Sequence, residues 1–331
     1  MGKICCLPFP RQTEELANKQ KKWGGIDLRP IIILMKYLYL PLLLLFAACA
    51  FVACGDDADD DFWGAGGQGN TQPVLPATGA EQHRLEVPAM KLGNDFIAHY
   101  DGDVMTYCLE YDRSKWHSRW IAFRFDNKTR AKNVSRKDYG ARPQYPADPK
   151  LPTGVAIPSD ASFNGYDHGH LCASADRLYS RTANDQTFYM TNMSPMIGNF
   201  NGGYWAALEG LVQSLGRNVN FSDTLYVVKG GTIQDGMFSQ RVASSRIVVP
   251  KYYFMALLRY RGGTYSAIAF WMEHKDYGNN FNNQANFATM KQHTVSVDQL
   301  ESLTGIDFFH NLPDAVEVLV EKQCTPSEWG M

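Results

Sequence analysis

Several familiar signatures are missing from this sequence, and each absence removes a class of function. No P-loop and no dinucleotide-binding fingerprint occurs, so nothing indicates a nucleotide-driven motor or a nicotinamide-dependent enzyme. No C-x-x-C pair or His/Cys cluster has the spacing of a zinc site. No internal repeat is present, which argues against a solenoid.

An overall excess of basic charge is also missing. The 331 residues carry a formal net charge of −2 and are 45% hydrophobic, which is an ordinary globular composition. Residues 113–150 differ, because they hold 11 Lys or Arg against 3 Asp or Glu, a local excess of 8 positive charges. Such a patch can attract phosphates, although a plain solvated surface has the same composition.

One long apolar run stands near the start of the chain. Met35–Ala53 begins with Met-Lys, continues as an apolar stretch and ends in small residues before Cys54. This pattern predicts a signal peptide with Cys54 as a lipidated cysteine, although Phe51 stands where Leu is usual and Cys49 follows a weaker competing motif. A retained membrane anchor is the alternative. The preceding segment is too long and polar for a leader, so Met35 is the expected true start.

The sequence therefore divides into three parts. Residues 1–54 form the leader, and residues 55–90 form an acidic and then Gly/Pro-containing tether. Residues 91–331 form one domain. We expect an exported protein, anchored to the membrane by lipid on Cys54 or by the uncleaved leader, on the cell surface or in the periplasm.

Cysteine is scarce in the predicted domain. Only Cys108, Cys172 and Cys324 remain there, so at most one disulfide can form and its pairing stays open. Cys172 lies two residues after His170, but a small buried residue is a better interpretation than a nucleophile.

Residues that can do chemistry are concentrated between Asp167 and Glu209. His170 ends a tight Asp-His-Gly-His turn, and Asn192, Asn201 and Glu209 follow it. Imidazole titrates near neutrality and can take a proton from water. Amide and carboxylate oxygens suit a hard ion such as Mg²⁺. Together these groups indicate hydrolysis of a phosphodiester with one metal ion.

Three motifs in this stretch resemble the DNA/RNA non-specific endonuclease family, whose core is the ββα-metal, or His-Me, finger. They are Asp167–His170 (DHGH), Thr191–Pro195 (TNMSP) and Asn201–Glu209 (NGGYWAALE), and the resemblance extends over roughly residues 95–330. One departure is His168, which stands where the family usually has Arg. The resemblance implies a metal-dependent endonuclease that cuts DNA and RNA with little sequence preference and leaves 5′-phosphate ends.

The resemblance also implies a role for each site residue. His170 is the general base, Asp167 anchors the turn, and Asn192 orients either the site loop or the phosphate. An arginine between residues 127 and 152 contacts the scissile phosphate. Arg136 matches best and Arg142 is the second candidate.

The metal is expected at Asn201. Asn201 is predicted to be the N-cap of a helix over Tyr204–Leu215 that Gly216 ends. Eight residues separate Asn201 from Glu209, about 12 Å along a helix axis, so both cannot bind one ion directly. Asn201 is therefore the direct ligand of Mg²⁺, or of Mn²⁺, and Glu209 acts through water. A surface charge is the alternative for Glu209.

The fold expected for residues 91–331 is mixed α+β, with a largely antiparallel central sheet, flanking helices and a ββα-metal finger at the sheet edge. Alternating residues predict a strand pair at Asp103–Glu110 and Arg119–Phe125, and another at Tyr252–Tyr260 and Tyr265–Met272. Further expected elements are strands at Thr224–Val228 and Arg246–Val249, a helix at Val297–Leu303 capped by Ser296, and a loop at Asn279–Asn286.

Two other functions fit the same motifs. A non-catalytic, nucleic-acid-binding lipoprotein would carry His168 as the mark of a decayed site. A nuclease toxin would carry the same catalytic residues. The intact set of His170, Asn192, Asn201 and Glu209 favours a working enzyme, and the leader favours one that stays with its own cell.

Overall fold

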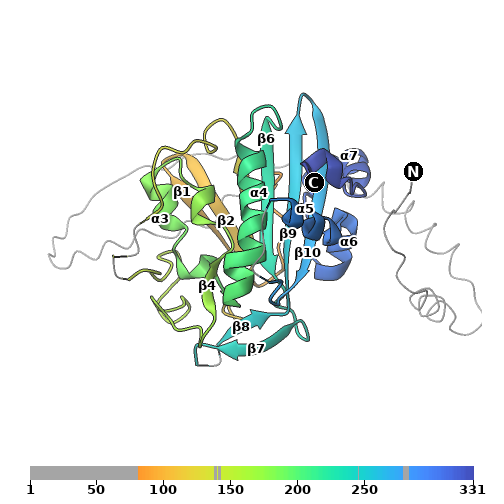
Figure 1. Ribbon diagram of the computed structural model, residues 1–331. Helices are drawn as coiled ribbons and strands as arrows, with labels where there is room; N and C mark the ends of the chain where they lie inside the picture. Colours follow the sequence, from red (N-terminus) through yellow and green to blue (C-terminus); the bar gives the residue numbers. More distant parts are fainter. Residues whose placement is uncertain (1–80, 138–139, 141–142, 245, 279–282) are drawn as a thin grey trace, which may run out of the picture. The chain divides into compact units, whose positions relative to one another are not determined.

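A computed structural model describes residues 81–331, except residues 138–139, 141–142, 245 and 279–282 (Figure 1). The predicted leader, Cys54 and most of the predicted tether lie outside the described residues. So does Arg142, the second candidate for the phosphate contact. Within the described part of the chain, no helix is long and apolar enough to cross a membrane.

Residues 81–90, which the sequence assigned to the tether, pack against the domain. The short 3₁₀ helix η1 (Glu81–His83) opens this segment, and Val87 is fully buried in the core. Asn311 donates a hydrogen bond to the carbonyl of Gln82 at 2.8 Å. The packed chain therefore starts earlier than the composition of the tether suggested.

The centre of the domain is one sheet of seven strands in the order β1-β2-β3-β6-β9-β10-β11. All of its neighbouring strands run antiparallel. Both predicted strand pairs are confirmed, as β2 with β3 and β9 with β10. The bounds are β1 Asp95–Asp101, β2 Val104–Asp112, β3 His117–Phe125, β6 Thr224–Gly231, β9 Tyr252–Arg261, β10 Thr264–Glu273 and β11 Thr294–Val295.

The two faces of this sheet bury two separate clusters of apolar side chains. Alternate residues of a strand point to opposite faces, so Leu225 and Val227 enter one cluster and Tyr226 and Val228 the other. Helix α4 (Ala206–Arg217) packs on the first face, and helices α6 (Val297–Thr304) and α7 (Asp314–Val320) contribute to the second. Figure 1 shows α4 crossing in front of the strands and α6 beside β10. The predicted α+β class is thereby confirmed.

Helix α6 is placed by local sequence signals. The Ser296 hydroxyl accepts from the Gln299 amide, and the Gln299 side chain accepts from the Ser296 amide, which forms a capping box. Gly305 ends the helix with a φ of 64°. The sequence prediction for this helix, including its cap, is confirmed to within one residue.

One local prediction was partly wrong. Residues 283–292 form helix α5 (Asn283–Gln292), whereas Asn279–Asn286 was expected to be a loop; residues 279–282 lie outside the described residues. Local composition is a weak guide here, because tertiary context readily overrides it. The predicted strand at Arg246–Val249 is confirmed as β8 (Ile247–Pro250), which is buried and pairs with β7 (Phe238–Val242) in a separate two-stranded sheet.

The start and end of α4 also differ from the prediction. A π-helical turn, η4 (Phe200–Trp205), leads into α4, so Asn201 lies inside this turn and is not an N-cap. Gly216 lies within the last turn and does not end the helix. A Cβ atom there would lie 2.4 Å from a ring carbon of Phe125 on β3. Gly216 is therefore needed for close approach of the helix to the sheet.

This contact predicts opposite effects for two glycines of α4. Gly216→Ala should lower the free energy of unfolding by about 1–3 kcal/mol, because an overpacked methyl group must displace Phe125 or the helix. Gly210→Ala is the matched control, because a Cβ there meets nothing within 4 Å. It should raise stability by about 0.5–1 kcal/mol through helix propensity. Urea unfolding of both variants tests this, and equal stabilisation by both would contradict the packing argument.

Candidate active site

The predicted site is built on two short strands and the helix that follows them. Strands β4 (Asp167–His170) and β5 (Met193–Met196) pair antiparallel, with His170 opposite Met193 and Asp167 opposite Met196. A Cβ on Gly169 would lie 2.3 Å from the Met196 sulfur, so only glycine permits this approach. The chain then enters η4 and α4. This order of elements is the ββα unit that the motifs predicted.

A cavity of about 500 Å³ opens between these elements. Five of the six predicted site residues line it, and Asn192 does not. Oxygen donors, a histidine and an arginine therefore converge on one space, as phosphodiester chemistry requires. The lining side chains that can take part in polar contacts are Arg136, Tyr145, Tyr166, Asp167, His168, His170, Ser174, Asn201 and Glu209.

His170 is buried at the edge of this cavity. Its ring meets Phe188 edge-on, with centroids 5.1 Å apart, and its carbonyl accepts a hydrogen bond from the Trp205 indole at 3.0 Å. Among the described residues, its Nε2 atom has no hydrogen-bond partner. Burial, with the positive charges of Arg136 and Lys229, lowers the pKa of His170 to about 3. The imidazole is therefore neutral at physiological pH.

Asp167 and Asn201 are joined across the cavity. The Asn201 amide nitrogen donates to Asp167 Oδ2 at 3.0 Å, which links β4 to η4. Because Asp167 accepts from the amide nitrogen of Asn201, this bond does not occupy the side-chain oxygen of Asn201. The predicted role of Asp167 as an anchor agrees with this contact, and the π-helical turn is what brings Asn201 into range.

Asn192 lies behind the cavity wall and is fully buried. Its side-chain oxygen accepts from the Cys172 amide at 2.8 Å, and its nitrogen donates to the carbonyls of Cys172 and Thr187. Of the two roles left open by the sequence, orientation of the site loop matches these contacts. Cys172 is buried beneath the site as expected, and neither Cys172 nor Cys108 forms a disulfide within the described residues.

A buried ion pair lies below Glu209. Lys229 of β6 and Asp176, which follows His170 by six residues, are 2.9 Å apart with both side chains inaccessible to solvent. Burial opposes the charge of Lys229, but Asp176 and Glu209 outweigh it and raise its pKa. Burial raises the pKa of Glu209 to about 8, although Lys229 and Arg136 pull it down.

The donor set of the cavity suits a hard divalent cation. Asp167, Asn201 and Glu209 offer only oxygen ligands to the shared space. The nearby thiol of Cys172 is a poor ligand, because burial raises its pKa and its backbone is held by Asn192. These residues therefore fit Mg²⁺ or Mn²⁺ better than a soft metal.

The family that this site belongs to follows from comparison with known sequences. The sequence profile described as DNA/RNA non-specific endonuclease matches residues 94–315. This chain belongs to that family. Membership makes it an endonuclease, and the matched range contains all the residues that line the cavity.

Individual nucleases and one solved structure are also similar to this chain. The chain is 31% identical over 220 residues to a nuclease of Nostoc sp., which covers 66% of this chain and 76% of the relative. It is 32% identical over 111 residues to the mitochondrial endonuclease G of Homo sapiens, covering 31% and 36%. In the crystal structure of an EndoG/EndoGI complex, a chain matches the fold with a TM-score of 0.54 and 20% identity, over 66% of this chain and 88% of that one.

His168 occupies the position at which this family usually has arginine. Its ring is stacked between Tyr145 and Phe163, with centroid distances of 4.3 and 4.2 Å. One ring nitrogen is hydrogen-bonded to the Ala161 carbonyl at 2.8 Å. His168 therefore holds the segment that contains Tyr145, Ala161 and Phe163 against β4. This packing explains the departure from the family residue without invoking loss of catalytic function.

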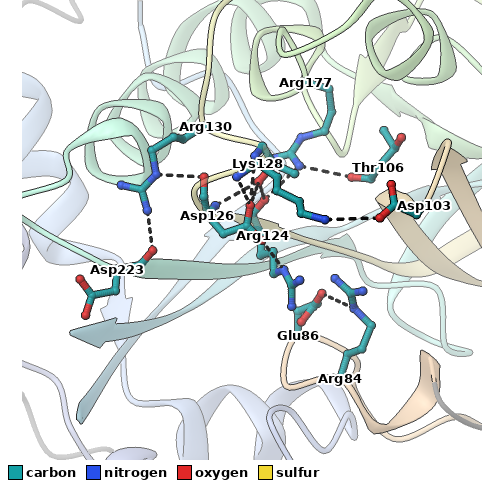
Figure 2. Close-up of polar contacts among 11 residues, drawn as sticks. Arg84, Glu86, Asp103, Thr106, Arg124, Asp126, Lys128, Arg130, Arg177 and Asp223 are labelled. Carbon is teal, nitrogen blue, oxygen red and sulfur yellow. Dashed lines mark hydrogen bonds and ion pairs between the residues drawn. The ribbon is translucent and has the colours of Figure 1, made fainter. Parts of the chain in front are cut away.

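The basic segment 113–150 is partly neutralised in the fold. Arg113 pairs with Asp95, Arg119 with Glu110, and Lys115 with Asp235. Figure 2 shows Lys128 reaching Asp103 and Arg130 turned toward the backbone of Asp126 and Asp223. Four acids from outside the segment, Asp95, Asp103, Glu110 and Asp235, therefore offset half of the excess of 8 positive charges, which the sequence could not show.

Arg136 is different, because it lies on the cavity wall. Its guanidinium carbon lies 5.7 Å from the centre of the Phe188 ring, and Lys137 lies 5.4 Å from the same ring. Phe188 also contacts His170. One aromatic ring thus positions both a cation and the imidazole.

Sequence reasoning missed Tyr145, Asp176 and Lys229. Lys229 had one recognisable signal, since it is the only charged residue in the otherwise apolar and glycine-containing run of β6. Asp176 and Tyr145 had none, because their importance comes from partners far away in the sequence.

Proposed function

We propose that this endonuclease hydrolyses phosphodiester bonds of DNA and RNA with little sequence preference, and that it leaves 5′-phosphate and 3′-hydroxyl ends. The observation that carries the proposal is a neutral, buried His170 on the same cavity as Asn201, Glu209 and Arg136. These groups are suited to bind the phosphate and to take a proton from the attacking water. Binding to phosphate and sugar in place of base edges gives affinity without sequence readout.

His170 is proposed to take a proton from the water that attacks phosphorus. A pKa of about 3 in the free protein makes the imidazole a weak base. A bound phosphate brings negative charge close to the ring, and a nearby anion raises the pKa of a histidine. Substrate itself would therefore increase the basicity of His170 at the moment when a proton must move.

The other residues are proposed to position the reacting groups and to neutralise the charge of the phosphate. Arg136 supplies a fixed positive charge to the phosphate in the transition state. Asp167 orients the Asn201 amide, and Asn192 holds the turn that follows His170. A divalent cation held by Asn201, and by Glu209 through water, would supply the charge that stabilises the phosphate and the leaving oxygen.

The first test concerns the base. His170→Ala should lose about 10²–10⁴-fold or more in turnover while the fold survives. His168→Arg is the matched control at a neighbouring ring, and should keep or raise activity because a planar guanidinium can replace the stacked imidazole. Plasmid and RNA digestion, with and without EDTA, measures both.

Three outcomes decide the proposal. Near-wild-type turnover by a folded His170→Ala protein would remove His170 from the role of base. Absence of any cleavage by the wild-type enzyme with Mg²⁺ and with Mn²⁺ would favour the non-catalytic binding protein. Products that DNA ligase cannot seal would contradict the 5′-phosphate ends.

The second test concerns the metal. Asn201→Ala should abolish cleavage even at high Mg²⁺, because the ion loses its proposed direct contact. Glu209→Gln should be milder and partly rescued by more metal, because it weakens a contact made through water. Metal titrations of the two variants separate these roles. If Glu209→Gln is the harsher change and cannot be rescued, Glu209 is the direct ligand.

We also propose that the protein is exported and anchored by lipid on Cys54. The support is the sequence alone: the apolar run Met35–Ala53, the small residues before Cys54 and the Asp-rich segment after it. The nuclease domain would then stand on a tether outside the cytoplasm. A single acyl chain binds membranes only weakly, so stable anchoring would need further acylation.

Labelling tests this location. In a lipoprotein-competent bacterium, the wild-type chain should incorporate labelled fatty acid and sediment with membranes. Cys54→Ser should lose the label and be released, while Cys49→Ser serves as the control and should behave as wild type. Membrane association that persists without label in Cys54→Ser would instead support the uncleaved anchor.

A further inference from the structure

Three carboxylates gather on the face of the sheet that lies opposite α4. Asp298 and Glu301 belong to α6, and Glu321 follows the last residue of α7. One oxygen from each lies within 4.8 Å of the other two. The Asp298 amide also donates to the Glu321 carbonyl at 3.1 Å, so the two helices meet at this cluster.

Glu321 is the unusual member of this cluster. Only 4% of its surface is exposed, and its Oε1 atom has no hydrogen-bond partner among the described residues. Its carboxylate is directed at those of Asp298 and Glu301, since they share the 4.8 Å cluster. A buried carboxylate without a partner is costly, because it has lost water and gained nothing.

Nothing in the described chain neutralises the three acids. The Phe308 amide donates to Glu301 at 2.8 Å, but none of the three carboxylates forms an ion pair within the described residues. Burial, together with Glu301, Glu317 and Asp298, raises the pKa of Glu321 to about 9. The negative charge of such a cluster can be neutralised in two ways, by a bound cation or by a retained proton.

We propose that Asp298, Glu301 and Glu321 form a second divalent cation site, specific for Ca²⁺ and separate from the catalytic cavity. Ca²⁺ takes 6–8 oxygen ligands at about 2.3–2.6 Å, so two oxygens on one ion can be up to about 5 Å apart. Three carboxylates supply up to six oxygens, and Glu321 needs no further partner. Mg²⁺ prefers to keep its waters and suits this partly buried set less well.

The site would fasten α6 to α7. Both helices pack through Val297, Leu300 and Val320 on the second apolar cluster, while α4 and the cavity use the first. Occupancy should therefore change the stability of the domain and leave the chemistry unchanged. This inference does not depend on the proposed nuclease mechanism.

Thermal unfolding of the full chain tests the site. The protein is stripped with EDTA, returned to saturating Mg²⁺ to fill the catalytic cavity, and titrated with CaCl₂. Wild type should gain about 5–10 °C in Tm at a hundredfold excess of Ca²⁺ over Kd. Glu321→Gln should lose this gain, and its Tm without Ca²⁺ should equal or exceed that of wild type, because a buried Gln needs neither a cation nor a retained proton.

Two further variants keep the test decisive. Asp307→Asn is the matched control, because it removes a nearby exposed charge but no member of the cluster, and should keep the response to Ca²⁺. Asp298→Asn is the second variant, for use if Glu321→Gln fails to fold, because Asp298 is half-exposed and its loss removes one ligand. It should raise the apparent Kd for Ca²⁺ at least tenfold.

A wild-type Tm that does not move with Ca²⁺, but rises on acidification, would mean that the cluster keeps a proton and binds no cation. An undiminished Ca²⁺ response in both Glu321→Gln and Asp298→Asn would mean that the ion binds elsewhere.

Discussion

The buried pair of Lys229 and Asp176 is the contact on which the catalytic side of this molecule depends. It ties the central strand β6 to the turn that follows His170, and both charges are removed from solvent. Such a pair adds little net stability, but loss of one partner leaves an uncompensated charge, at a cost of about 3–5 kcal/mol. Burial is the largest cause of the lowered pKa of His170 and of the raised pKa of Glu209; Lys229 adds to the first shift and opposes the second, while Asp176 adds to the second. The pair thus links the position of the turn to the protonation of both groups.

Around this pair, the cavity is assembled from rigid neighbours. Gly216 lets α4 approach Phe125, and Gly169 lets β4 approach Met196. The first contact packs α4 on β3 and the second packs β4 on β5, and the π-helical turn directs Asn201 at Asp167. Asn192 completes the support from behind by bonding the backbone of Cys172. Contacts behind the cavity wall therefore help to hold the groups that face it.

The opposite face of the sheet carries a different electrostatic problem. There Asp298, Glu301 and Glu321 meet without a basic partner in the described residues, whereas behind the cavity Asp176 is paired with Lys229, and Lys229 and Arg136 act on Glu209. The central sheet thus separates a cavity whose buried acids have basic neighbours from an acidic cluster that has none in the described residues. A cation bound to the acidic cluster would help to hold α6 and α7 in place.

The sequence alone was enough to predict the endonuclease family and the class of fold. The motifs around His170, Asn201 and Glu209 are local, and strand alternation and the Ser296 cap depend only on nearby residues, so both could be predicted. The tertiary structure alone decided what surrounds them. The basic segment is partly neutralised by acids from outside it, such as Asp95 and Asp235, and His168 is held by Tyr145 and Phe163. The π-helical turn at Asn201 and the burial of Lys229 likewise arise from packing, because electrostatic and steric partners are set by proximity in space and not by order along the chain.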